Sequence, residues 1–115
     1  MRLTQKKGDT AVAQAIATFA NMGYDISVPL TESAPYDLVV EVSGKLKKVQ
    51  VRYCSSNEVD LRRIHSNSKG YVVKKTKNGA YDWLYILSPN NGEYLIKECL
   101  AGRRSVSLVE KYKIK

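Results

Sequence analysis

The sequence has little of several features that mark whole classes of protein. It contains two cysteines, Cys54 and Cys99, in 115 residues. Their spacing matches no zinc motif and does not indicate a disulfide scaffold, so we expect a reduced, intracellular (cytoplasmic) protein. No apolar run approaches the roughly 18 to 20 residues that span a bilayer, and no stretch is typical of a signal peptide.

Size and net charge indicate the number of domains and the kind of partner. The length favours a single domain over residues 1–115, and the hydrophobic fraction of 43% is ordinary for a globular protein. A net charge of +8 is high for so short a chain and favours a polyanionic partner. No segment pairs a large apolar face with a basic one, so nucleic acid is favoured over a membrane surface.

The basic charge is concentrated in one window. Between Leu61 and Tyr81 there are six Lys or Arg residues and no acid. A solvated face is the ordinary explanation of a charge run, but the absence of counter-charge also favours phosphate binding. The residues that we predict to contact phosphates or base edges are Arg62, Arg63, Asn67, Lys69, Lys74, Lys75 and Lys77.

Apolar periodicity predicts the first elements. Residues 8–22 carry the i, i+3, i+4 stripe of an amphipathic helix, with Asp9 or Thr10 as its N-cap and Gly23 as its stop. A short strand follows over 24–28. Period-two alternation over 36–42 and 46–53, around a Ser-Gly turn, predicts a β-hairpin.

The second half mixes polar and apolar segments. We expect residues 54–70 to be a loop with a short helical turn near Leu61 to Ile64, and 71–75 to be a strand. A buried strand over 82–88, a turn at Pro89 to Gly92, and short elements within 93–98 and 105–110 complete the chain. This order predicts an α/β (α+β) domain with a mixed sheet.

Three polar side chains of the predicted hairpin converge. A two-residue turn places Asp37 opposite either Gln50 or Arg52, and all three side chains fall on one face in both registers. A cross-strand ion pair worth a few tenths of a kcal/mol is the structural explanation. The functional explanation is a carboxylate that binds a divalent metal beside a cation that stabilises phosphate charge, as phosphodiester cleavage requires.

The stretches "GDTAVAQAIATFANMGYDISVPLTESAPYDLVV" and "LKKVQVRY" resemble the PD-(D/E)XK nuclease superfamily, in particular its small branch of intron homing endonucleases and phage or bacterial endonucleases. The closing segment "YDWLYILSPNNGEYLI" is similar too, so the resemblance covers nearly the whole chain. It implies a restriction-endonuclease-like mixed central sheet with the N-terminal helix packed on it. The motif in that branch is an Asp after a Tyr, then Gln-x-Lys.

The resemblance implies roles for the hairpin residues. Asp37 would bind the metal, with the carbonyl of Val51 as a further ligand, and Gln50 would lie near the metal or the attacking water. Arg52 stands where the family has its catalytic Lys, and Val12 stands where it has a helix Glu. Asp9, one turn earlier, is a further candidate ligand. Arg keeps the charge of Lys but cannot release a proton near neutral pH.

These roles imply a Mg²⁺- or Mn²⁺-dependent, sequence-specific endonuclease that cuts double-stranded DNA, in a bacterial or phage-infected cell. A double-strand cut implies a homodimer or homotetramer. Because Val12 and Arg52 depart from the family pattern, a module that binds DNA or structured RNA without cleavage stays open, as does a structural subunit of a nucleoprotein assembly.

Overall fold

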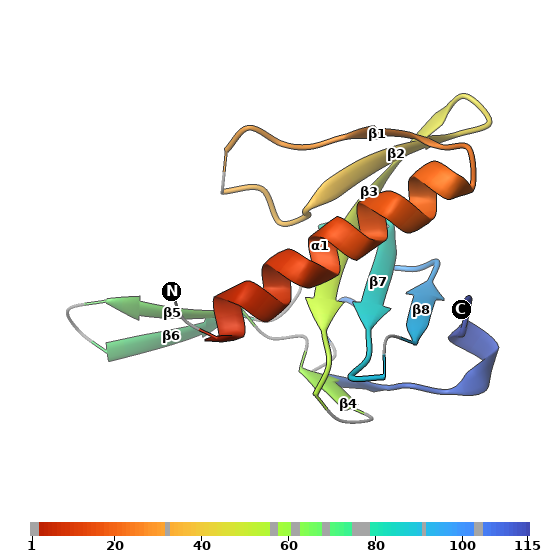
Figure 1. The fold of residues 1–115 in the computed structure, drawn as a ribbon. Helices are drawn as coiled ribbons and strands as arrows, with labels where there is room; N and C mark the ends of the chain where they lie inside the picture. Colours follow the sequence, from red (N-terminus) through yellow and green to blue (C-terminus); the bar gives the residue numbers. More distant parts are fainter. Residues whose placement is uncertain are drawn as a thin grey trace.

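A computed structural model describes residues 3–31, 33–55, 58–60, 63–67, 70–74, 79–90, 92–102 and 105–115 (Figure 1). Side chains are described for 6–31, 33–55, 79–90, 92–102 and 105–115. Within this part of the chain, no helix is both long and apolar enough to cross a membrane.

The N-terminal helix α1 (Leu3–Asn21) lies obliquely across one face of a sheet (Figure 1). Its buried stripe includes Ala11, Ala15 and Phe19, none of which is exposed to solvent. The helix stops at Gly23, as predicted, because this residue adopts a φ of +86°. The Gly23 N–H then donates to the Ala20 carbonyl at 3.0 Å, and the Tyr24 N–H donates to the Phe19 carbonyl at 3.1 Å. This Schellman-type ending brings the Tyr24 ring against Phe19, with centroids 6.2 Å apart.

The predicted start of α1 was wrong. The helix begins at Leu3, so Asp9 and Thr10 lie in its interior and neither is the N-cap. The Thr10 hydroxyl donates backwards to the Lys6 carbonyl at 2.9 Å. Leu, Gln and Lys before Gly8 are good helix formers, and one interior glycine costs only about 1 kcal/mol. The helix therefore extends through Gly8 to Leu3.

The predicted hairpin is present as β2 (Leu38–Val42) and β3 (Lys45–Tyr53), joined by a two-residue turn. Ser43 and Gly44 both have positive φ, at 53° and 79°, which is the signature of a type I′ turn. Leu38 pairs with Val49, so partner numbers sum to 87. Of the two predicted registers, the structure therefore selects the one that places Asp37 beside Gln50.

The main sheet is mixed, as predicted, with strand order β1-β2-β3-β7-β8. β3 runs parallel to β7, and every other neighbouring pair in this sheet is antiparallel. The remaining strands are β1 (Asp25–Ser27), β7 (Trp83–Leu87) and β8 (Glu93–Ile96).

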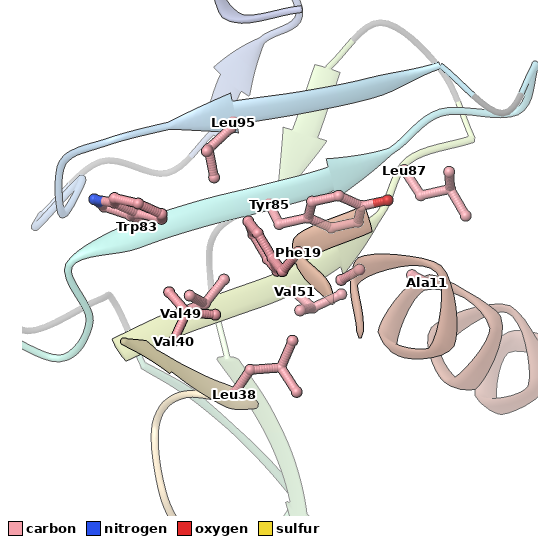
Figure 2. Close-up of a cluster of buried hydrophobic side chains, with 11 residues drawn as sticks. Ala11, Phe19, Leu38, Val40, Val49, Val51, Trp83, Tyr85, Leu87 and Leu95 are labelled. Atoms are coloured by element: carbon pink, nitrogen blue, oxygen red, sulfur yellow. The ribbon is translucent and has the colours of Figure 1, made fainter. Parts of the chain in front are cut away.

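The two faces of the sheet bury different clusters. On the α1 face, Val49, Val51 and Tyr85 pack against Phe19 in one apolar cluster (Figure 2). The opposite face buries a second cluster that is formed by Cys54, Tyr81, Leu84, Ile86, Ile96, Leu100 and Val106. Because strand side chains alternate, Gln50 and Arg52 face away from α1, toward this second side.

A buried polar network lies within the α1 face. Glu93 is only 1% exposed, and its Oε1 accepts hydrogen bonds from the hydroxyls of Thr18 and of Tyr85, the latter at 2.6 Å. Burial and then the hydrogen bond to Glu93 raise the pKa of Tyr85 above its ordinary value. The network therefore joins α1 to β7 and β8 through a satisfied carboxyl group.

The prediction of a loop over 54–70 was wrong. The segment contains β4 (Glu58–Asp60) and β5 (Arg63–Asn67), and β5 pairs with β6 (Gly70–Lys74) as a hairpin. Arg63 and Ile64 are extended in β5, which contradicts the predicted helical turn. The strand predicted over 71–75 is confirmed as β6. Pairing with β6 explains why the polar segment of β5 is extended, because the two strands satisfy each other's backbone hydrogen-bonding groups.

The chain ends in two short elements. β9 (Ser105–Ser107) pairs with β4 in a separate two-stranded sheet. A 3₁₀ turn (Glu110–Tyr112) follows, after which the Ile114 N–H donates to the Glu93 carbonyl at 2.8 Å. The terminal residues thus contact β8.

Candidate active site

Asp37 lies one residue before β2 and reaches the edge of β3. Its Oδ2 accepts the backbone N–H of Val51 at 2.8 Å and the side-chain Nε2 of Gln50 at 3.2 Å. The Asp37 N–H donates to the Val49 carbonyl at 2.8 Å. The β2–β3 pairing begins at Leu38, so β2 has no backbone carbonyl to accept the Val51 N–H. The Asp37 carboxylate accepts this N–H instead. Asp37 is thus held by both its main chain and its side chain.

Val51 contributes its backbone to the same edge. The N–H and C=O of one strand residue point to the same side, toward the same neighbouring strand. Since the Val51 N–H meets Asp37, the Val51 carbonyl faces the edge where Asp37 lies. The predicted role of the carboxylate and the carbonyl as ligands of one metal ion stays a prediction.

Gln50 and Arg52 are half-buried on the face away from α1. Their partners on β7 are Leu84 and Ile86, which are fully buried in the second cluster. The Nε atom of Arg52 is itself buried. The Arg52 guanidinium therefore lies next to buried apolar side chains, and the low dielectric there strengthens its attraction for a nearby negative charge.

Sequence reasoning missed a second aspartate with the same arrangement. Asp82 lies one residue before β7, and its Oδ2 accepts the Lys48 N–H at 2.9 Å, while its own N–H donates to the Lys48 carbonyl at 2.8 Å. Asp37 and Asp82 thus hold β3 from its two sides. The signal was present in the sequence, because each aspartate follows a tyrosine and precedes an apolar strand.

The two α1 positions differ from each other. Val12 is half-buried and packs against the cluster on the α1 face, as its place on the helical stripe predicted. Asp9 is exposed. At 3.6 residues per turn it lies about 160° around the helix from the buried Ala11. Its predicted role as a metal ligand stays a prediction that this exposure does not favour.

Within the described residues, no group of three His, Cys, Asp or Glu side chains is arranged to hold a metal. The two oxygen ligands predicted from the family resemblance, the Asp37 carboxylate and the Val51 carbonyl, are of the hard type that suits Mg²⁺.

The β5–β6 hairpin, which extends away from the main sheet, contains three of the predicted nucleic-acid residues (Figure 1). The backbones of Arg63, Asn67 and Lys74 belong to it, and Arg63 is the cross-strand partner of Lys74. Their side chains lie outside the described ones, and Arg62, Lys69, Lys75 and Lys77 lie outside the described residues.

A comparison with family models decides the assignment, because the model of the PD-(D/E)XK endonucleases matches residues 2–113. The chain belongs to the PD-(D/E)XK endonuclease family. This confirms the resemblance to the PD-(D/E)XK nucleases that was predicted from the sequence, and it supports a nuclease function.

Solved structures agree with this family. The bacterial homing endonuclease I-Ssp6803I is similar with a TM-score of 0.78 and 28% sequence identity, over 95% of this chain and 80% of that one. The restriction-endonuclease-like fold, with α1 on a mixed sheet, is thereby confirmed. No curated protein sequence matches the chain significantly.

In this PD-(D/E)XK endonuclease, Asp37 and Gln50 lie together at the edge of β3 and Arg52 follows on the same face. The predicted convergence of the first two side chains is therefore observed as a direct contact. The structure also shows Asp82 in contact with Lys48 on the same strand, and neither residue belongs to the motif.

Proposed function

We propose that this chain is a Mg²⁺- or Mn²⁺-dependent endonuclease that hydrolyses phosphodiester bonds in double-stranded DNA at specific sequences. The observation that carries the proposal is the contact of the Asp37 carboxylate with both Gln50 and the Val51 backbone, in a chain of the PD-(D/E)XK endonuclease family.

The Asp37 carboxylate and the Val51 carbonyl would hold the metal. Both are oxygen ligands on one strand edge, which fits a hard divalent cation. When bound, such an ion lowers the pKa of a coordinated water and offsets charge at a phosphate. The backbone hydrogen bond from Val51 to Asp37 keeps the carboxylate oriented before the ion arrives.

Gln50 and Arg52 have separate roles. The Gln50 amide already donates to Asp37, so it orients this carboxylate and presents its remaining groups to a water molecule. The Arg52 guanidinium stabilises the negative charge that develops on the scissile phosphate. Since Arg52 does not exchange a proton near neutral pH, proton transfer in this site falls to water.

The basic window supplies DNA affinity. Three of its seven predicted contact residues, Arg63, Asn67 and Lys74, belong to a hairpin that extends from the main sheet (Figure 1). Phosphate contacts of this kind give salt-dependent affinity, and base-edge contacts give specificity. A second chain, in a dimer or tetramer, would supply the cut in the other strand.

A binding module without cleavage is the second candidate. The observation that favours it is the packing of Val12 against the apolar cluster at the position where the family carries a Glu. With Arg52 in place of Lys as well, such a chain would keep DNA binding and lose hydrolysis.

Plasmid cleavage with Mg²⁺ or Mn²⁺ tests the proposal. Asp37→Asn keeps an acceptor for the Val51 N–H but loses the charge, so we expect cleavage to fall by at least about 100-fold with the fold retained. Glu41→Gln is the matched control, because Glu41 is an exposed acid in the adjoining strand β2. Equal cleavage by Asp37→Asn and wild type would overturn the assignment, and DNA binding without any cleavage would favour the second candidate.

A further inference from the structure

Lys48 lies on β3, two residues before Gln50, at the level where Asp82 contacts the strand. On its β7 side its backbone exchanges two hydrogen bonds with Asp82, at 2.9 and 2.8 Å. On its β2 side it is the cross-strand partner of Val39. Lys48 is half-buried and shares the face of Gln50 and Arg52.

The side chain of Lys48 joins two distant segments. Its Nζ donates to the Gly79 carbonyl at 2.6 Å. The same Nζ lies 5.8 Å from the centroid of the Tyr36 ring, within the range of a cation–π interaction. The ammonium group is therefore held by two intramolecular contacts, although it lies on the face of the proposed site.

The turn at Gly79 depends on glycine for conformation rather than for space. Its φ is +79°, whereas a Cβ built at this position would meet no atom within 4 Å. A residue with a side chain would strain this turn. The backbone around the carbonyl that accepts from Lys48 is thus set by a glycine-dependent conformation.

Of the two segments that Lys48 joins, one adjoins the proposed metal ligand and the other adjoins the proposed DNA-binding hairpin. Tyr36 directly precedes Asp37, the proposed metal ligand. Gly79 follows the β5–β6 hairpin in the chain and leads through Tyr81 and Asp82 into β7. One lysine therefore links the segment after the basic hairpin to the segment that carries the carboxylate.

We infer that Lys48 is a positioning residue that couples the segment following the hairpin to the placement of Asp37. The inference deepens the proposed function and rests on it. Lys48 acts through Tyr36 and Gly79 and makes no contact with DNA phosphate. Its loss lowers the rate of cleavage rather than the affinity for DNA.

The test compares Lys48→Met, which keeps length but removes the charge, with Lys48→Arg, which keeps a cationic donor. Lys45→Met is the matched control, since Lys45 is an exposed lysine at the start of β3. For Lys48→Met we expect the single-turnover cleavage rate at saturating DNA to fall by about tenfold to a hundredfold. DNA affinity stays within roughly threefold, Lys48→Arg recovers most of the rate, and Lys45→Met resembles wild type.

A second measurement does not depend on activity. The Val51 amide, which donates to Asp37, reports the carboxylate position by NMR. We expect Lys48→Met to shift this resonance and speed its hydrogen exchange, while Lys45→Met changes neither. If Lys48→Met does not fold by circular dichroism, Tyr36→Leu removes the other end of the link and should produce the same shift.

Two results would overturn the inference. Weaker DNA binding by Lys48→Met, with the slope of log K against log salt reduced by about one, would show a phosphate contact instead. An unchanged Val51 amide would show that Lys48 does not position Asp37. Failure of the proposed function gives a different result. If the wild-type protein does not cleave DNA but Lys48→Met still shifts the Val51 amide, the nuclease proposal is wrong and the positioning role of Lys48 stands.

Discussion

The Nε2 of Gln50 lies 3.2 Å from Oδ2 of Asp37, so an amide donor contacts the carboxylate that we propose as a metal ligand. Gln50→Glu should remove this donor and set two carboxylates together. We expect the metal-free protein to lose about 1 kcal/mol of stability through like-charge repulsion. Mg²⁺ should reverse the loss, and each tenfold gain in its affinity adds about 1.4 kcal/mol.

Thermal unfolding of wild type and Gln50→Glu, with and without Mg²⁺, measures this difference. A larger Mg²⁺-induced rise in Tm for Gln50→Glu is expected. An equal rise in both proteins would place the metal away from these two side chains.

Arg52 should limit the chemical step. Arg52→Lys introduces a group that can exchange a proton, and we expect the single-turnover rate to rise by about tenfold. Arg52→Gln should lower the rate by about 100-fold, because the charge at the phosphate is lost. Adding Val12→Glu to Arg52→Lys should raise the rate further. If Arg52→Lys is slower than wild type, the guanidinium itself is required.

The buried pair Tyr85–Glu93 should make stability fall at high pH. Burial raises the pKa of Tyr85 in the folded state above its unfolded value near 10. Above that pH the unfolded chain releases a proton that the folded chain retains, so the free energy of unfolding falls by about 1.4 kcal/mol per pH unit. The contribution of Tyr85 is fully present below pH 10 and is lost as the pH rises toward the folded pKa.

Urea unfolding of wild type and Tyr85→Phe between pH 8 and 11 checks this. Tyr85→Phe should cost about 1 to 3 kcal/mol at pH 8, because Glu93 loses a donor, and its stability should fall less steeply above pH 10. Parallel curves for the two proteins would assign the alkaline loss to other groups.

Phe19 should be a major source of stability. Its ring is fully buried and contacts Tyr24, Trp83 and Tyr85, with centroids 5.8 to 6.3 Å away. Figure 2 shows the Trp83 and Tyr85 rings beside it. Phe19→Ala should lower the free energy of unfolding by about 3 to 5 kcal/mol in urea titrations. Ala17→Ser, at an exposed position of α1, should change it by about 0.5 kcal/mol.

The cationic partners Arg63 and Lys74 should contribute to DNA affinity. Like charges at partnered strand positions disfavour a hairpin, and phosphate binding would offset that cost. Replacing both with Gln should reduce the slope of log K against log salt by about 1.8, which is two phosphate contacts. Fluorescence anisotropy between 50 and 200 mM salt measures the slope, and an unchanged slope would move the DNA contacts elsewhere.

Much of the site could be predicted because its parts are local. The period-two alternation placed Gln50 and Arg52 on one face, and the turn brought Asp37 beside them. Two registers remained open until the structure placed the two-residue turn at Ser43 and Gly44, where both residues have positive φ. The start of α1 was missed because intrinsic helix propensity, rather than an apolar stripe, extends its first turns.

The role of Lys48 could not be predicted from the pattern that identified its neighbours. On β3 it is one more polar residue on an alternating face. Its contacts come from Tyr36 and Gly79, which belong to segments that precede and follow the strand by many residues. Asp82 was missed for the same reason, although it repeats the Tyr-Asp pattern of the site.

By itself, the sequence determined the helix stop, the presence of the hairpin, the alternation of its strands and the family motif, because each depends on residues close together in the chain. Only the tertiary structure decided that β3 runs parallel to β7 and that β4 pairs with β9. Such pairings join distant segments, and they are selected by which apolar faces can be buried together rather than by any local pattern.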